Sequence, residues 1–197
     1  MLQNSLSVRV TLASATATFL TLTLSACSIN VQKAQNGQDK KVDIRTPVGG
    51  IHVSKEATAS DVGLPVYPGA RLKPDHTDSD NKSANVNISG FGYSLRVIAL
   101  QYESDDAPAK VIAFYNDQLQ KFGNVLVCHT SGLDVNAHVN GLDKDSNELS
   151  CQGSSGSNVE LKVGSKENQH IVAVEPEGKG STFSLVYVRT HGKDEEI

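Results

Sequence analysis

Residues 86–123 read VNISGFGYSLRVIALQYESDDAPAKVIAFYNDQLQKFG, and the two patterns in this stretch determine the fold that we expect. In its first half, apolar side chains recur at every second position from Phe91 to Val97, which is typical of a β-strand with one buried face. The run then becomes apolar on both faces as far as Leu100, as in a central strand of a sheet. We therefore expect a long strand over residues 86–102, bent or bulged at its two glycines.

The second half of the stretch predicts an amphipathic helix of about four turns that lies across a sheet. Asp105 or Asp106 can cap its N-terminus, Pro108 is favoured in a first turn, and Gly123 is a good residue to end it. The apolar residues at helical spacing are Val111, Phe114, Tyr115, Leu119 and Phe122. We expect these side chains to pack in the core.

Alternating or short apolar runs predict further strands on both sides of this unit. They lie at residues 41–45, 51–54, 125–128, 159–163, 171–174 and 183–188. One main amphipathic helix packed on one face of an antiparallel sheet is an α+β fold, which is the class that we predict. We expect a single domain over residues 42–190, followed by a charged tail at 191–197.

The composition is that of an ordinary globular domain and argues against nucleic acid as a partner. Of the 197 residues, 38% are hydrophobic and 20% are charged, and the formal net charge is −4. A nucleic-acid binder needs a clustered basic face, which this acidic balance does not favour. Base stacking needs aromatic side chains, and this chain has 5% of them and no tryptophan.

The N-terminal segment combines a single charge, Arg9, with an uncharged run over residues 10–24 that is too short to span a bilayer. The run ends in Leu24-Ser25-Ala26-Cys27, which resembles the lipobox of bacterial lipoproteins at all four positions. The resemblance implies that the Cys27 thiol receives a diacylglyceryl group, that residues 1–26 are removed, and that the new amino group is acylated. The alternative is an ordinary cleaved signal peptide or an uncleaved anchor, with the cysteine there by chance.

Acyl chains on Cys27 would anchor the domain to a membrane, because two or more chains hold stably where one holds only marginally. Ser28 follows the cysteine in place of the aspartate that resembles an inner-membrane retention signal. This favours the outer membrane, with the domain facing the periplasm. Residues 27–41 are rich in polar side chains and predict a flexible tether between the lipid and the domain.

Three cysteines are an odd number for an exported chain, and lipidation of Cys27 would leave Cys128 and Cys151 as a pair. An oxidising compartment permits a disulfide between these two, which we expect. Two buried free thiols, or a metal pair with His129 beside one cysteine, are the alternatives.

Residues 64–70 (LPVYPGA) and 105–115 (DDAPAKVIAFY) resemble an uncharacterised module of bacterial exported proteins, in which a Tyr-Pro-Gly-Ala turn and a strand precede a helix. No activity is attached to that module, so the resemblance supports the fold and leaves the function open.

No catalytic, metal or cofactor motif stands out in the sequence. Residues 153–156 (GSSG) have the wrong spacing for a nucleophile elbow, and residues 90–92 (GFG) lack the third glycine of a dinucleotide loop. Residues 143–147 match the first ligand positions of a calcium loop without its glycine and closing glutamate. We interpret the acidic residues 75–80 and the scattered histidines as solvated, and expect no cofactor, no metal and no catalytic residue.

Together these features predict a bacterial cell-envelope lipoprotein with a non-enzymatic domain that binds an envelope protein partner or has a structural role. The alternative is a membrane-tethered hydrolase whose site is assembled only in the fold. A deep pocket that joins a histidine, a carboxylate and a hydroxyl would favour the hydrolase. An exposed apolar patch or a free sheet edge would favour binding.

Overall fold

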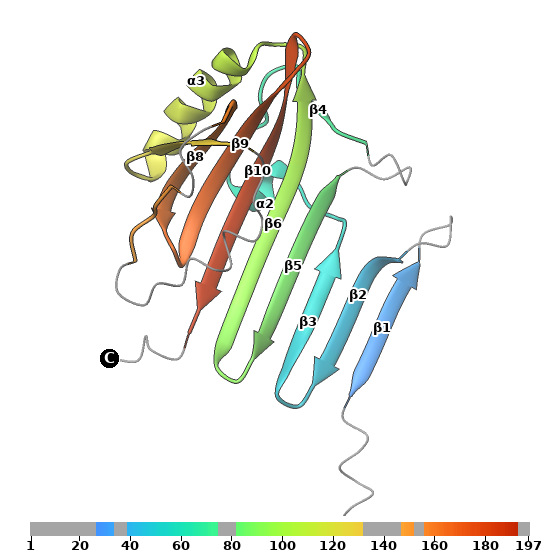
Figure 1. Cartoon of the computed structure of the whole chain (residues 1–197). Coiled ribbons are helices and arrows are strands. Elements are labelled where there is room, and N and C mark those ends of the chain that lie inside the picture. Colours follow the sequence, from blue (N-terminus) through green and yellow to red (C-terminus); the bar gives the residue numbers. More distant parts are fainter. Residues whose placement is uncertain (1–26, 34–38, 75–81, 132–146, 152–155, 193–197) are drawn as a thin grey trace, which may run out of the picture.

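The structure, a computed structural model, describes residues 27–33, 39–74, 82–131, 147–151 and 156–192. Its strands form one antiparallel sheet in the order β1-β2-β3-β5-β6-β10-β9-β8-β7, with β4 paired to β6 beside that path (Figure 1). The strands are β1 (Ser28–Lys33), β2 (Asp39–Thr46), β3 (Gly49–Ser54), β4 (Arg71–Leu72), β5 (Ser83–Gly90), β6 (Tyr93–Ser104), β7 (Leu126–Thr130), β8 (Asn158–Ser165), β9 (Asn168–Glu177) and β10 (Gly180–His191). The helices are α2 (Ala59–Val62), α3 (Pro108–Leu119) and the 3-10 turn η2 (Gln120–Phe122).

The predicted α+β class with one main amphipathic helix is wrong, because strands dominate the fold. Strands hold 57% of the described residues and helices only 14%. A helix does form within the predicted stretch, but α3 has 12 residues and ends before the 3-10 turn. Its N-cap is Ala107, so neither aspartate before it caps the helix through its side chain.

The predicted long strand over residues 86–102 is instead the hairpin of β5 and β6. Phe91 and Gly92 both have positive φ angles, 54° and 81°, which is the geometry of a two-residue type I′ turn. Across this hairpin Val86 pairs with Val97. The turn is hard to find in the sequence because such turns favour asparagine, aspartate or glycine at the position that Phe91 occupies.

Strands β1 and β2 begin within residues 27–41, where we expected a flexible tether. β1 starts at Ser28, directly after Cys27, and pairs with β2 in antiparallel register. Ile29 and Val31 alternate with polar residues in β1. Pairing with β2 supplies backbone hydrogen bonds, which the polar composition of this segment does not predict. The ordered sheet therefore reaches the predicted lipidation site.

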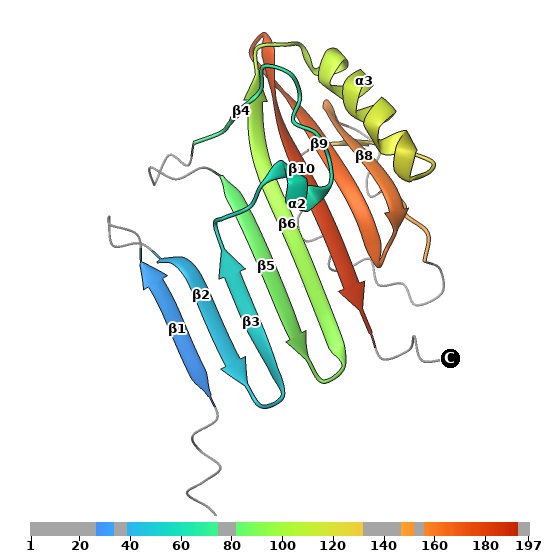
Figure 2. The ribbon, with the colours of Figure 1, turned by 180° about the vertical axis from the view of Figure 1, so that it is seen from behind.

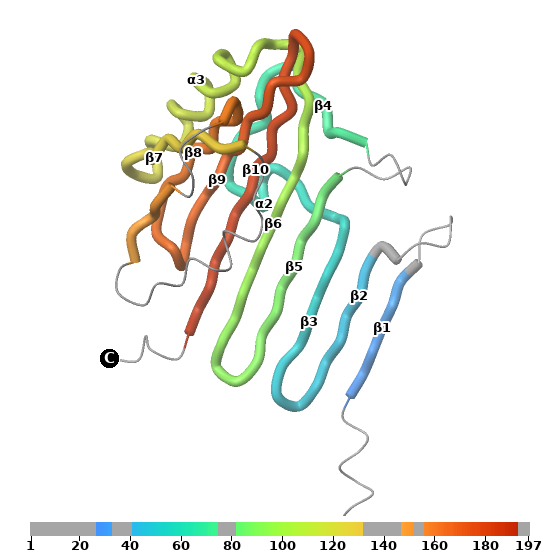
Figure 3. The backbone as a smooth tube through the Cα atoms, in the orientation of Figure 1, coloured from blue at the N-terminus to red at the C-terminus, as the bar shows by residue number. Residues whose placement is uncertain are grey.

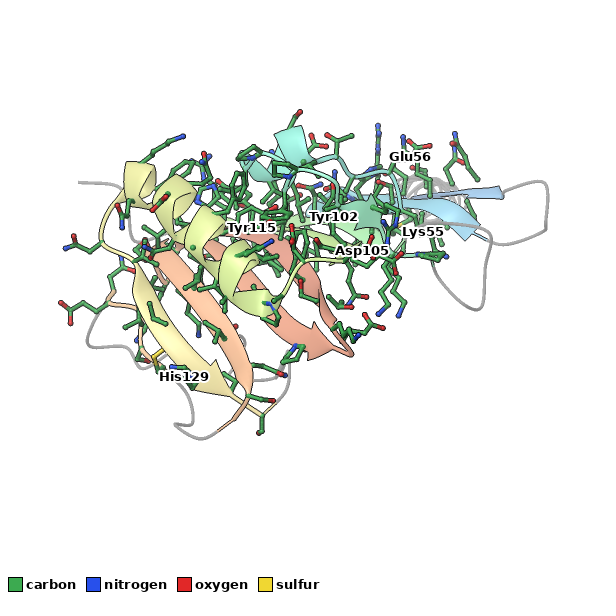
Figure 4. The ribbon with its side chains drawn as sticks, turned by 90° about the horizontal axis from the view of Figure 1, so that it is seen from above. Lys55, Glu56, Tyr102, Asp105, Tyr115 and His129 are labelled. Atoms are coloured by element: carbon green, nitrogen blue, oxygen red, sulfur yellow. A yellow bond between two sulfur atoms is a disulfide. The ribbon has the colours of Figure 1, made fainter. Side chains whose placement is uncertain are left out.

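Helices α2 and α3 pack on the same face of the sheet, over β6, β8, β9 and β10 (Figure 2). The side chains between helices and sheet form the hydrophobic core, which includes Val62, Leu64, Ile98, Leu100, Val111, Tyr115, Leu119, Leu161, Val172, Phe183 and Leu185. Tyr115 and Tyr102, which are labelled near each other in the view from above in Figure 4, both belong to this core. Within the described residues, no helix has the length and apolar character that crossing a bilayer requires.

Residues 64–70 and 105–115, the two stretches that carry the resemblance to exported proteins, contact each other in the structure. The Tyr115 hydroxyl accepts a hydrogen bond from the backbone N–H of Tyr67 (3.0 Å) and donates one to the Pro65 carbonyl (3.1 Å). The Tyr67 hydroxyl donates to Asp106 (2.9 Å), and hydrogen bonds from Lys110 and then Tyr67 lower the pKa of the Asp106 carboxyl. These hydrogen bonds connect α3 and the residue pair before it to the loop that precedes β4.

We call the sheet face opposite to α2 and α3 the open face. The strand register places apolar side chains on it along β1, β2, β3 and β5: Ile29, Val31, Val42, Ile44, Ile51, Val53, Val86 and Ile88. The alternate residues of these strands, such as Asn30, Asp43, His52 and Asn87, are polar and lie on the other face. Neither helix of the described chain covers the open face, so this apolar surface is the unusual feature of the fold.

Candidate functional site

A groove of about 500 Å³ lies on the open face over β5, β6, β10 and β9. The apolar side chains that line it are those of Ala84, Tyr93, Leu95, Val97, Ala99, Ile171, Val186 and Val188. Ligand pockets commonly have volumes of roughly 300–1,000 Å³ and a mainly apolar lining with a few polar groups. This groove is therefore the candidate site.

The groove arises from strands that are apolar on both faces. In β6, Ile98 is fully buried beneath the helices, while Val97 and Ala99 on either side of it line the groove. β10 has the same pattern. The sequence showed this two-sided pattern, and we interpreted it as burial on both faces. In the structure the groove side is only partly buried.

Polar side chains also line the groove. Lys82 and Gln101 lie on the β5–β6 side, and Lys166 and Gln169 lie on the β8–β9 side. A few amide and ammonium groups in an apolar pocket can hydrogen-bond a bound molecule and fix its orientation. The arrangement suits a molecule with an apolar body and polar groups along its length.

A buried ion pair lies on the open face of β8. The Lys162 ammonium is 2.9 Å from a carboxylate oxygen of Glu160, and their side chains are only 6% and 9% exposed. The same ammonium donates to the Ser150 carbonyl (3.5 Å), and the backbone N–H of Lys166 donates to the Asn147 carbonyl (3.2 Å). Residues 147–151 therefore lie over this side of the sheet.

The predicted disulfide between Cys128 and Cys151 is confirmed, with Cα atoms 5.4 Å apart. It connects β7, the edge strand, to the end of residues 147–151 and so holds that segment in place. Because both sulfurs are bonded to each other, a metal pair with His129 is not formed. Figure 4 shows His129 on this edge strand beside the disulfide.

Cys27 is exposed, is not part of a disulfide and directly precedes β1. The other residues of the lipobox and its leader, 1–26, lie outside the described part of the chain. Lipidation of Cys27 therefore stays a prediction from the sequence.

The described histidines do not line the groove. His52 Nδ1 is 3.9 Å from Asp43 Oδ2 on the opposite face of the sheet, and a hydrogen bond from Arg45 lowers the pKa of that carboxyl. His170 lies between aromatic rings on the helix side, and burial lowers its pKa. Among the described residues, no group of three His, Cys, Asp or Glu side chains is placed to hold a metal ion. The acidic residues 75–80 and the calcium-like residues 143–146 lie outside this part of the chain.

Comparisons of the chain with protein-family models, with curated proteins and with solved structures find no match in any of the three. The groove and the sequence signal at Cys27 are the features of this chain that bear on its function.

Proposed function

We propose that this protein is a bacterial cell-envelope lipoprotein, anchored through an acylated Cys27, whose domain binds an apolar segment of an envelope protein partner in the open-face groove. The anchor is supported by the lipobox resemblance. The binding role is supported by one observation, an apolar groove of about 500 Å³ on a sheet face that neither described helix covers.

The half-buried state of the groove gives a driving force for binding. Val97, Val186 and Val188 are partly exposed although they lie in the middle of the sheet. Complete burial of a valine or leucine side chain contributes roughly 1.5–3 kcal/mol relative to full exposure, and these side chains have gained only part of that. A partner that fills the groove buries these side chains completely, and its backbone can hydrogen-bond the polar side chains that line the groove.

The hydrolase alternative needs a histidine, a carboxylate and a hydroxyl within hydrogen-bond reach at one pocket. The contact between His52 and Asp43 lies on the other face of the sheet and is 3.9 Å long. The groove therefore favours a binding role.

Site-specific photo-crosslinking in the native host tests this proposal. A photoreactive amino acid replaces Val188 in the groove, and a matched variant carries it at Asn87, on the opposite face of the same sheet. We expect a protein adduct at position 188 that position 87 does not give. Val97→Asp, which places a charge in the groove, should abolish that adduct.

Two outcomes would contradict the proposal. The first is the same set of adducts at positions 188 and 87, which would show that the groove is not selective. The second is a lipid adduct alone at position 188, which would show that the groove holds an acyl chain in place of a protein segment.

A further inference from the structure

Two hairpin turns and the start of β1 lie at the same end of the sheet (Figures 1 and 3). The turns are residues 47–48, between β2 and β3, and residues 91–92, between β5 and β6. The register of β1 on β2 places Cys27 level with Thr46, which directly precedes the first turn. The predicted lipidation site and both turns are thus at one level of the molecule.

Large apolar side chains are exposed at this end. Val48 is 55% exposed and Phe91 is 78% exposed, one on each turn. Ile29 beside Cys27 is 71% exposed, and Tyr93 beside the second turn is 47% exposed. We call these four residues the apolar end. Clustered exposed apolar side chains mark surfaces that bind proteins or membranes.

The two turns are joined to each other. The backbone N–H of Phe91 donates a hydrogen bond to the Val48 carbonyl (3.2 Å). Gly49 pairs with Gly90 beside that bond, and a Cβ on Gly49 would collide with the Ser89 carbonyl oxygen. This close approach holds the Val48 and Phe91 side chains at fixed positions relative to each other.

The turn between β5 and β6 explains the conformation of residue 91 but not the choice of phenylalanine there. The φ of Phe91, 54°, lies in the left-handed region, where asparagine and glycine are favoured and bulky residues are outliers. Its side chain is exposed, so core packing does not account for an aromatic residue there either. An exposed aromatic side chain that neither the turn nor the core requires, at a position where it is strained, points to a role outside the fold.

We propose that the apolar end inserts into the surface of the lipid bilayer that holds the Cys27 anchor, which makes it a second membrane contact. This inference rests on the proposed anchor. Cys27 adjoins β1 without a tether, and three strand spacings of about 4.8 Å separate β1 from β5, so the turn at Phe91 is about 14 Å from the anchor across the sheet. Aromatic and apolar side chains that penetrate about 5–10 Å are typical of interfacial membrane contacts.

A single tryptophan at this end reports its depth in the membrane, because the chain has none of its own. The lipidated full-length mature protein carrying Phe91→Trp is reconstituted into vesicles of phosphatidylethanolamine and phosphatidylglycerol, with and without bromine-labelled acyl chains. The matched control is Val127→Trp, which replaces a side chain 48% exposed on β7, at the opposite edge of the sheet. We expect a blue-shifted emission that brominated lipid quenches for Phe91→Trp, and neither effect for Val127→Trp.

A second variant, Phe91→Asn, removes the apolar ring and introduces a residue that the turn favours, so the fold is retained. We expect it to speed the transfer of the lipidated protein between vesicles by about tenfold, from the loss of one buried aromatic side chain. An unchanged transfer rate would count against insertion.

Flotation of the vesicles and tryptophan quenching together distinguish a failure of the membrane contact from a failure of the Cys27 anchor. In one outcome the protein floats with the vesicles, but brominated lipid quenches both tryptophan variants alike or quenches neither. The anchor is then retained, and the membrane contact of the apolar end is refuted. Protein that carries no lipid and does not float overturns the anchor and the inference together.

Discussion

Tyr115→Phe should lower the free energy of unfolding by roughly 2–3 kcal/mol. The Tyr115 side chain is fully buried, and its hydroxyl bonds the Tyr67 N–H and the Pro65 carbonyl. Phenylalanine retains the ring contacts with Phe183 but leaves both backbone groups without this partner. An unsatisfied buried group costs about 1–3 kcal/mol. The Tyr67 N–H is buried and takes most of that cost, whereas the Pro65 carbonyl is only partly buried and adds less.

Urea denaturation followed by circular dichroism measures the effect. Tyr93→Phe is the matched control, because its side chain is 47% exposed and the change should lie within about 0.5 kcal/mol of zero. If Tyr115→Phe costs no more than Tyr93→Phe, the Tyr115 hydroxyl does not tie α3 to the loop before β4. The structural role that we assign to the contact between residues 64–70 and 105–115 would then be wrong.

Three further predictions concern stability. Reduction of the disulfide between Cys128 and Cys151, which are 23 residues apart, should cost roughly 3 kcal/mol and lower the Tm, and an unchanged thermal melt would contradict this. Lys162→Met should cost about 3–5 kcal/mol in urea denaturation because it leaves the buried Glu160 carboxylate without its lysine, and a loss no larger than that of a surface variant would refute it. Burial raises the pKa of Tyr115, so the unfolded state releases this proton at a lower pH than the folded state does. The contribution of the protonated Tyr115 to the free energy of unfolding should be fully present below about pH 10 and should decline above it. Denaturation curves that coincide at about pH 9 and about pH 11 would contradict this.

Local patterns in the sequence predicted the strands and the helix whose apolar side chains all face one side. Period-two runs located most strands, and the spacing of Val111, Tyr115 and Leu119 located α3, because these side chains face one core. The pairing of Cys128 with Cys151 followed from the number of cysteines and the expected compartment. The strands and the helix depend on residues near one another in the chain, and the disulfide was predicted from the number of cysteines.

The features that escaped prediction depend on neighbours or conformations that the residue pattern does not show. β1 is a mostly polar segment that becomes a strand because β2 lies beside it. The β5–β6 turn contains Phe91, which no turn preference selects. The groove could not be predicted without knowing that α2 and α3 pack on the same face of the sheet. Residues 97–100 are apolar on both sides of the strand, so their sequence does not show which side the helices cover.

The most direct test of the account is the intact mass of the mature protein purified from membranes of its native host. We predict a chain that begins at Cys27 and carries the added mass of a diacylglyceryl group and an amide-linked acyl chain. A mature chain that begins at another residue, or one without the mass of fatty chains, would contradict the anchor on which the proposed function and its membrane contact depend.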